Sequence, residues 1–156
     1  GRDPVPWVAR SEGGTMEPGS SWREALQRVL ESHPAVRLAV LFGSAARGEP
    51  GPESDVDLGL ILDSAAWTPP ACWSLEAALG RACRRTVELV PLDRAPPLLR
   101  FEIARDGRVL LDRSPHAWVD FRARAMTDWW DWAPTARFLN SAAAARLRAA
   151  LADGSP

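Results

Sequence analysis

The chain has 156 residues, 46% of them apolar and 25% charged, with a net charge of −1 at pH 7. This length and composition are typical of one compact globular domain with a hydrophobic core. A net charge close to zero argues against direct nucleic-acid binding, which depends on an excess of basic residues. No apolar run is long enough to cross a membrane and no signal peptide opens the chain, so we expect a cytoplasmic protein.

The basic and aromatic residues exclude further classes of protein. All 19 basic residues are arginine, which rules out a P-loop lysine and a lysine nucleophile. Tyrosine is absent, so any tyrosine that this protein modifies must belong to another chain. The two cysteines and two histidines have spacings that fit neither a zinc motif nor a disulfide framework.

The first residues predict a flexible leader followed by a helix. Residues 1–19 are rich in Gly, Pro and charge without an apolar period, and Met16 is a candidate translation start. A capping box of Ser21 and Glu24 opens a helix that ends at His33-Pro34. The next predicted elements are strands at 36–42 and 56–62 joined by a loop, a turn at 63–70, a helix at 74–85, a strand at 86–90, a helix at about 96–105 and a short, possible edge strand at 108–111.

The C-terminal part predicts two helices. Ser114 as cap and Pro115 at the first position open one helix, and Pro134 breaks or kinks it before an alanine-rich helix at about 135–151. The tryptophans at 129, 130 and 132 cannot all face inward on one helix, so at least one exposed indole is expected, which indicates a protein interface. The element order predicts a small α/β or α+β domain at 20–113 with a helical extension at 114–156 packed on it.

The chemically informative residues lie around the loop between the first two strands. Gly43 and Ser44 follow a strand directly, and such a turn lets backbone N–H groups and a hydroxyl hold phosphate oxygens. Asp55 and Asp57 open the next strand at positions i and i+2, so both carboxylates face the same side. Carboxylates together with substrate phosphates are the ligands that Mg²⁺ prefers. The pattern therefore predicts a Mg²⁺ site for phosphoryl or nucleotidyl transfer, with two ions in the usual two-metal arrangement.

A third acid is expected on a neighbouring strand. Glu88 is the natural candidate, because it lies alone in an otherwise apolar strand. It would complete the metal site or accept a proton from an acceptor hydroxyl. A surface acid on an edge strand is the alternative interpretation, and Asp93 is the fallback, although Asp93 also suits a helix cap.

The segments GSAARG and SDVDL resemble the GS…DxD signature of the DNA polymerase β-like nucleotidyltransferases. Residues 21–112 resemble the minimal branch of that superfamily, and residues 87–113 resemble the corresponding part of MntA-type antitoxins. The resemblance implies a minimal nucleotidyltransferase fold, with a small mixed sheet flanked by helices. It assigns nucleotide binding to Gly43 and Ser44, and metal binding and catalysis to Asp55, Asp57 and Glu88, where the family usually has Asp at the third place.

Two residues beside these motifs are further candidates for nucleotide binding. Ser54 directly precedes Asp55, and Arg47 either contacts the phosphates or the base of ATP or braces the loop against Glu53.

The resemblance also implies a substrate and a partner. MntA-type antitoxins neutralise a HEPN ribonuclease toxin by transferring AMP from ATP to one of its tyrosines, so we expect ATP as substrate and a HEPN-type toxin as partner in a heteromeric complex. Two alternatives stay open. One is a catalytically weak or silent antitoxin that acts by binding; the other is a nucleotidyltransferase for small molecules such as antibiotics.

Overall fold

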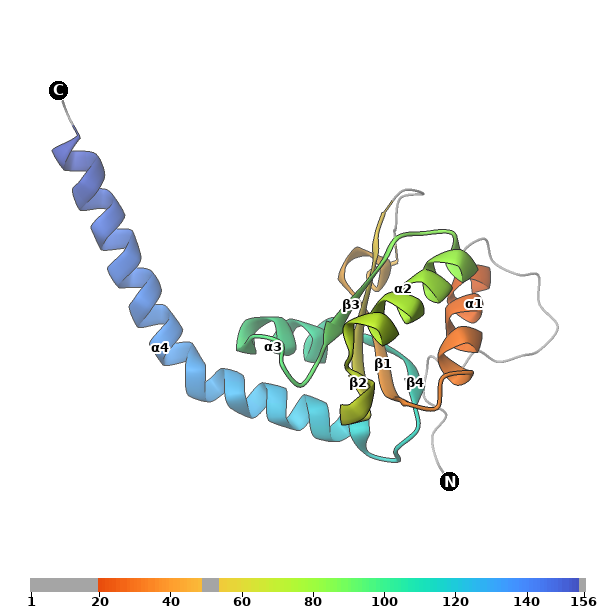
Figure 1. Cartoon of the computed structure of the whole chain (residues 1–156). Helices are drawn as coiled ribbons and strands as arrows, with labels where there is room; N and C mark the ends of the chain where they lie inside the picture. The colour runs from red at the N-terminus through yellow and green to blue at the C-terminus, as the bar shows by residue number, and fades with distance from the viewer. Residues whose placement is uncertain (1–19, 49–53, 155–156) are drawn as a thin grey trace.

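The computed structural model describes residues 20–48 and 54–154 (Figure 1). The predicted leader at 1–19 and Glu53 therefore lie outside the described residues. The elements in chain order are α1 (Ser20–Glu31), β1 (Val36–Phe42), the 3₁₀ turn η1 (Gly43–Ala45), β2 (Val56–Leu62), the 3₁₀ turn η2 (Ser64–Ala66), α2 (Pro69–Cys83), β3 (Val87–Pro91), α3 (Pro97–Asp106), β4 (Arg108–Asp112) and α4 (Ala117–Asp153).

The four strands form one mixed sheet in the order β3-β2-β1-β4. β1 pairs antiparallel with β2 and with β4, whereas β2 and β3 run parallel. The parallel pair needs a crossover, which α2 provides. β4 lies at one edge, as its sequence indicates, and β3 lies at the other. The small mixed sheet with flanking helices predicted from the sequence is confirmed.

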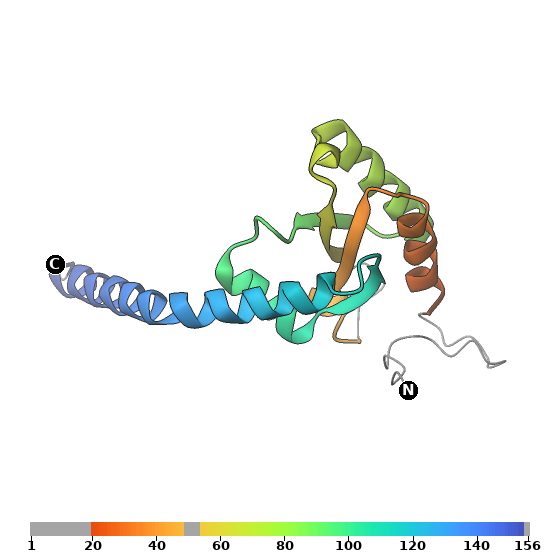
Figure 2. The same cartoon turned by 90° about the horizontal axis from the view of Figure 1, so that it is seen from below.

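Helices cover both faces of this sheet, and each face has its own apolar cluster. In Figure 2, α1 and α2 lie on one side of the sheet, while α3 and the first part of α4 lie on the other. Alternate residues of β1 divide between the two clusters: Ala39 and Leu41 pack toward α1 and α2, and Leu38 and Val40 pack toward α3 and α4. The middle of β1 is buried on both faces, which explains its nearly continuous apolar sequence.

α2 begins five residues earlier than the sequence analysis predicts. Thr68 caps the helix by accepting a hydrogen bond from the Ala71 N–H, and Pro69 and Pro70 occupy the first positions. Proline is tolerated there because the first helical N–H groups have no partner within the helix. The prediction of a turn through residue 70 is therefore wrong: these prolines start the helix instead of preceding it.

α4 is one continuous helix with Pro134 inside it, so the prediction of two separate helices is wrong. It bends part-way along its length in Figure 1, as expected for an internal proline. Its predicted cap is also wrong, because the helix begins at Ala117 and the Ser114 side chain makes no cap hydrogen bond within the described ranges. Instead Asp112 accepts hydrogen bonds from the N–H groups of Ser114 (3.1 Å) and Trp118 (3.2 Å). No helix in the described ranges has the length and apolar character that a membrane span needs.

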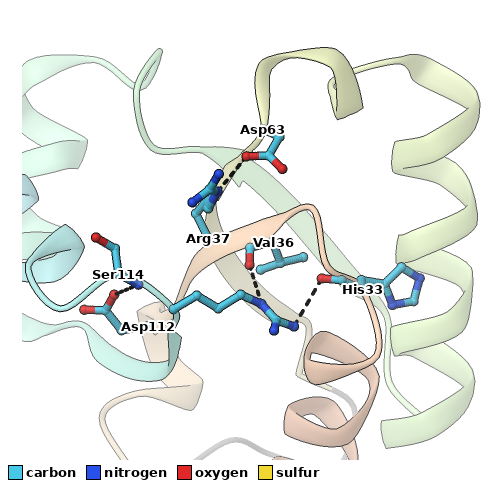
Figure 3. Close-up of polar contacts among 7 residues, drawn as sticks. His33, Val36, Arg37, Asp63, Asp112 and Ser114 are labelled. Atoms are coloured by element: carbon cyan, nitrogen blue, oxygen red, sulfur yellow. Dashed lines mark hydrogen bonds and ion pairs between the residues drawn. The ribbon is translucent and has the colours of Figure 1, made fainter.

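Two arginines, Arg113 and Arg37, make polar contacts at the end of the sheet where β1 begins (Figure 3). Arg113 donates to the carbonyls of Val36 (2.8 Å), Glu31 (2.7 Å) and His33 (3.3 Å), which ties the β4–α4 connection to the end of α1. Arg37 and Asp63 form an ion pair of 2.6 Å between β1 and the residue that follows β2. Both contacts lie at the end of the sheet opposite the Gly43 turn, so they hold the frame without entering the predicted site.

Candidate active site

Asp57 is the centre of the site that the sequence predicts. It pairs with Phe42 of β1 on one side and with Glu88 of β3 on the other. Residues opposite one another in a sheet project from the same face. The sheet register therefore brings the Asp57 and Glu88 carboxylates to one face, and Asp55, two residues earlier, precedes the same strand.

The Gly43 turn lies directly against Asp57. Gly43 has a φ of +72°, and a Cβ atom placed on it would lie 2.7 Å from Asp57 Oδ2. Only glycine meets both conditions, since it tolerates a positive φ and leaves room for the carboxylate. Two backbone hydrogen bonds of 3.2 Å close the turn, from Ala46 N to Gly43 O and from Arg47 N to Ser44 O. Ser44 is exposed, so its hydroxyl is available to a ligand beside Asp57.

The surroundings of Asp57 raise the pKa of its carboxyl group. Partial burial raises the pKa of Asp57, and the negative charges of Glu88 and then Asp55 raise it further. Among the described residues, no side chain donates a hydrogen bond to any of the three carboxylates and none forms an ion pair with them. Like charges held together without a counter-charge indicate a place where a cation or a positively charged group is expected.

A family model matches the part of the chain that contains this geometry. Residues 24–116, well over half of the chain, match the model described as "Polymerase beta, Nucleotidyltransferase". The chain belongs to this nucleotidyltransferase family. The match spans the Gly43 turn, the strand with Asp55 and Asp57, and the strand with Glu88.

The chain is similar to a curated protein adenylyltransferase and to solved toxin–antitoxin structures. It is 27% identical to the "Protein adenylyltransferase MntA" of Aphanizomenon flos-aquae over an alignment of 113 residues that covers 67% of this chain and 75% of the relative. A solved structure described as a toxin–antitoxin with AMP-PNP matches at a TM-score of 0.66 and 21% identity, over 77% of this chain and 97% of that one. A complex of a tri-AMPylated Shewanella oneidensis HEPN toxin with an MNT antitoxin matches at 0.63 and 19%, over 80% and 98%. At these identities the solved structures establish the fold.

The donors of this nucleotidyltransferase site are of the kind that Mg²⁺ binds. Three carboxylates provide hard oxygen ligands, and substrate phosphates would complete the coordination. Within residues 20–48 and 54–154, however, no three His, Cys, Asp or Glu side chains lie close enough together to hold an ion without rearrangement. The chemistry of Asp55, Asp57 and Glu88 suits Mg²⁺, but their positions do not form a ready three-ligand site, so their assignment as ligands stays a prediction.

The two flanking candidates have different surroundings. Arg47 is exposed, and it lies near the end of α3: the pKa of Asp106 is lowered chiefly by its hydrogen bond from Arg105, and in smaller part by the charge of Arg47. Ser54 is partly buried, and its carbonyl accepts a long hydrogen bond of 3.5 Å from Arg85. Roles for Arg47 and Ser54 in nucleotide binding stay predictions, and the alternative contact of Arg47 with Glu53 involves a residue outside the described ranges.

A separate cavity of about 320 Å³ lies toward the other end of the same sheet face. Its lining includes Ile61, Arg37 and Ser114, the last two of which are labelled in Figure 3, together with Arg100 and Arg124. Neither the Gly43 turn nor any of the three acids lines it. Asp93, the fallback for the third acid, lines this cavity instead of standing beside Asp57.

One contact beside the turn was not predicted from the sequence. The Arg23 side chain of α1 donates a hydrogen bond of 2.9 Å to the carbonyl of Ala45, the last residue of the Gly43 turn. The available signal was the position of Arg23, three residues before the buried Leu26, on the edge of the apolar stripe of α1.

Proposed function

We propose that this protein is a protein adenylyltransferase that transfers AMP from Mg²⁺-ATP to a tyrosine of a HEPN-type toxin and thereby acts as its antitoxin. The observation that carries the proposal is the position of Asp57, which stands against Gly43 and in register with Glu88. The adenylyltransferase relative, and the solved neighbours that contain AMP-PNP or an AMPylated HEPN toxin, support the choice of nucleotide and partner.

The residues of the site divide the work of AMP transfer. The N–H groups and hydroxyl of the Gly43-Ser44 turn hold the triphosphate, with Arg47 and Ser54 beside them. Asp55, Asp57 and Glu88 would hold Mg²⁺, which when bound offsets the negative charge of the acids and of the triphosphate. Glu88 is exposed at the edge of the sheet, where a partner can approach it.

The reaction is an in-line displacement at the α-phosphorus. The acceptor oxygen forms a bond to this phosphorus while the bond to the bridging oxygen breaks, and pyrophosphate leaves with that electron pair. Glu88, in register with Asp57 on the neighbouring strand, is the candidate general base that accepts the proton of the acceptor hydroxyl. Because the chain contains no tyrosine, the acceptor tyrosine belongs to the partner.

AMP transfer from α-labelled ATP to the purified partner toxin tests the proposal. We expect labelled toxin with the wild-type protein and a loss of at least about a hundredfold with Asp55→Asn combined with Asp57→Asn. Asp63→Asn is the matched control, because Asp63 is an exposed aspartate at the far end of β2 whose partner is Arg37. A wild-type protein that transfers no AMP, or a double variant as active as the control, would contradict the proposal.

Neutralisation by binding alone is the second candidate. It is favoured by the absence of a ready three-ligand metal cluster in the described part of the chain. The same double variant separates the two: if it still neutralises the toxin fully in a ribonuclease assay, contact suffices and AMP transfer is not the means of neutralisation.

A further inference from the structure

Two arginines from different elements share one tryptophan beside the active-site loop. The guanidinium carbon of Arg23 lies 5.1 Å from the ring centroid of Trp22, and that of Arg85 lies 5.2 Å from it. Arg23 belongs to α1, whereas Arg85 lies between α2 and β3. Both distances are within the range of cation–π attraction, which is strongest for tryptophan. Trp22 itself packs against the buried cluster under α1 and α2, so its ring has a fixed position.

Each arginine also holds one end of the segment that links the two active-site motifs. Arg23 donates to the carbonyl of Ala45, the residue after Gly43-Ser44. Arg85 donates to the carbonyl of Ser54, the residue before Asp55. The phosphate-binding turn and the start of the strand with the two aspartates are therefore both tied to one indole.

We propose that Trp22, Arg23 and Arg85 form a clamp that positions the nucleotide-binding turn against the two aspartates. The inference rests on the proposed function for its choice of ligand, because the turn is taken to bind the triphosphate of ATP. The three are positioning residues: they act through the carbonyls of Ala45 and Ser54.

The position of Arg23 is costly for the fold alone. Its Nε is buried and has no hydrogen-bond partner in the described part of the chain. Burial lowers the pKa of Arg23, and the nearby positive charge of Arg108 lowers it further. Burying an incompletely bonded guanidinium next to a like charge costs free energy that an apolar side chain would avoid. Arg23 offsets part of this cost by donating a hydrogen bond of 2.9 Å from its guanidinium to the carbonyl of Ala45 in the turn.

The clamp predicts which amide groups depend on it, and hydrogen exchange of the ligand-free protein measures this directly. Arg23→Gln is expected to speed exchange at Ala46 and Arg47, whose N–H groups close the turn, by about tenfold. Arg85→Gln is expected to do the same at Val56, whose N–H bonds to the carbonyl of Thr86. Trp22→Leu is expected to affect both places, because both arginines lose their shared ring.

The matched controls replace exposed arginines on α1, which carries Arg23, and on α2, which ends just before Arg85. Arg28→Gln on α1 and Arg81→Gln on α2 remove a charge from a side chain with no hydrogen bond or ion pair in the described ranges. Both are expected to exchange as wild type does at all these amides. Equal exchange in Arg23→Gln and wild type, with the whole fold intact, would overturn the clamp.

Nucleotide affinity separates positioning from simple support of the fold. Well below the melting temperature, calorimetry should show Mg²⁺·AMP-PNP bound about tenfold more weakly by Arg23→Gln than by Arg28→Gln, with partial rescue in Arg23→Lys, which keeps one charged donor. Trp22→Leu added to Arg23→Gln and Arg85→Gln should cause no further loss, because Trp22 acts through those two side chains. Unchanged affinity in Arg23→Gln, despite a lowered melting temperature, would show a purely structural role and refute the proposal.

The two proposals fail separately in these measurements. If the wild-type protein binds no nucleotide, the proposed function is wrong, while hydrogen exchange of the ligand-free protein still decides the clamp. If nucleotide binds and the clamp variants leave both readouts unchanged, the clamp alone is wrong.

Discussion

At the scale of single residues, the position of Asp57 that suits cation binding is unfavourable for the stability of the free protein. The fold places its carboxylate partly out of water and near the charges of Glu88 and Asp55, and the pKa of Asp57 rises as a result. Like charges placed together in this way lower the stability of the free protein, and in the proposed function a bound cation would offset that cost. The structure without ligands therefore shows an electrostatic cost at the proposed site.

The pH dependence of stability should reveal this cost. Because the folded pKa of Asp57 lies above its unfolded value, folding favours the protonated form, and stability falls as pH rises through the folded pKa. Asp57→Asn removes the penalty, so without Mg²⁺ its melting temperature should exceed that of wild type at pH 7 by roughly 1–3 °C, with no gain well below pH 4. A lower melting temperature for Asp57→Asn at pH 7 would show that the carboxylate makes a stabilising contact instead.

A side chain at Gly43 should lower activity more than it lowers the stability of the fold. Gly43→Ala brings a side chain to a φ of +72° and a Cβ to 2.7 Å from Asp57 Oδ2. Gly48 has a φ of +97°, but no atom of the described part of the chain lies within 4 Å of the added Cβ, so Gly48→Ala carries the strain without the clash. Each change costs about 1–2 kcal/mol of backbone strain. Only Gly43→Ala should lower AMP transfer by about a hundredfold, because it displaces the Asp57 carboxylate to which we assign metal binding. Equal activity of the two variants would contradict this assignment.

At the scale of elements, the start of α4 should depend on the side chain of Asp112 and not on that of Ser114. Asp112→Ala removes both hydrogen bonds that the carboxylate accepts from the Ser114 and Trp118 N–H groups. We expect a loss of about 1–2 kcal/mol, as for other helix caps. Ser114→Ala should change stability by less than about 0.5 kcal/mol. Thermal unfolding of both variants measures this, and the reverse order would restore Ser114 as the cap.

The elements also show what the sequence could and could not predict. Strand β1 was predictable because its apolar run suits a strand buried on both faces. The GS and DxD motifs predicted that the Gly43 turn and the two aspartates lie side by side at strand ends, and the structure places Gly43 against Asp57. The cap at Asp112 was not predictable, because Ser114-Pro115 carries the stronger local signal and the distance to Trp118 depends on the path of the chain. The pairing of Asp57 with Glu88 depended on the parallel register of β2 and β3, which no local pattern specifies.

At the scale of the whole molecule, the site and the far part of α4 lie apart. The site is built where the Gly43 turn meets β2 and β3, whereas α4 continues past the body of the protein in both Figure 1 and Figure 2. Trp130 is 68% exposed and Phe138 is 72% exposed, so the expectation of an exposed indole is confirmed. The use of this surface as a protein interface stays a prediction, as does the division of the chain at residue 113.

The far part of α4 should contribute little to the stability of the domain. Among residues 137–154 no side chain is buried, so this segment has no tertiary packing to lose. Deleting residues 138–156 should therefore change the melting temperature by less than about 2 °C. A longer deletion of residues 128–156 is the control. It removes the ion pair between Asp128 and Arg100 (2.6 Å) and the stacking of Trp129 on Phe101 (5.0 Å between centroids), and it should lower the melting temperature by several degrees. If the shorter deletion destabilises the protein as much as the longer one, the far part of α4 packs against the domain in solution, and its apolar side chains are not a free surface.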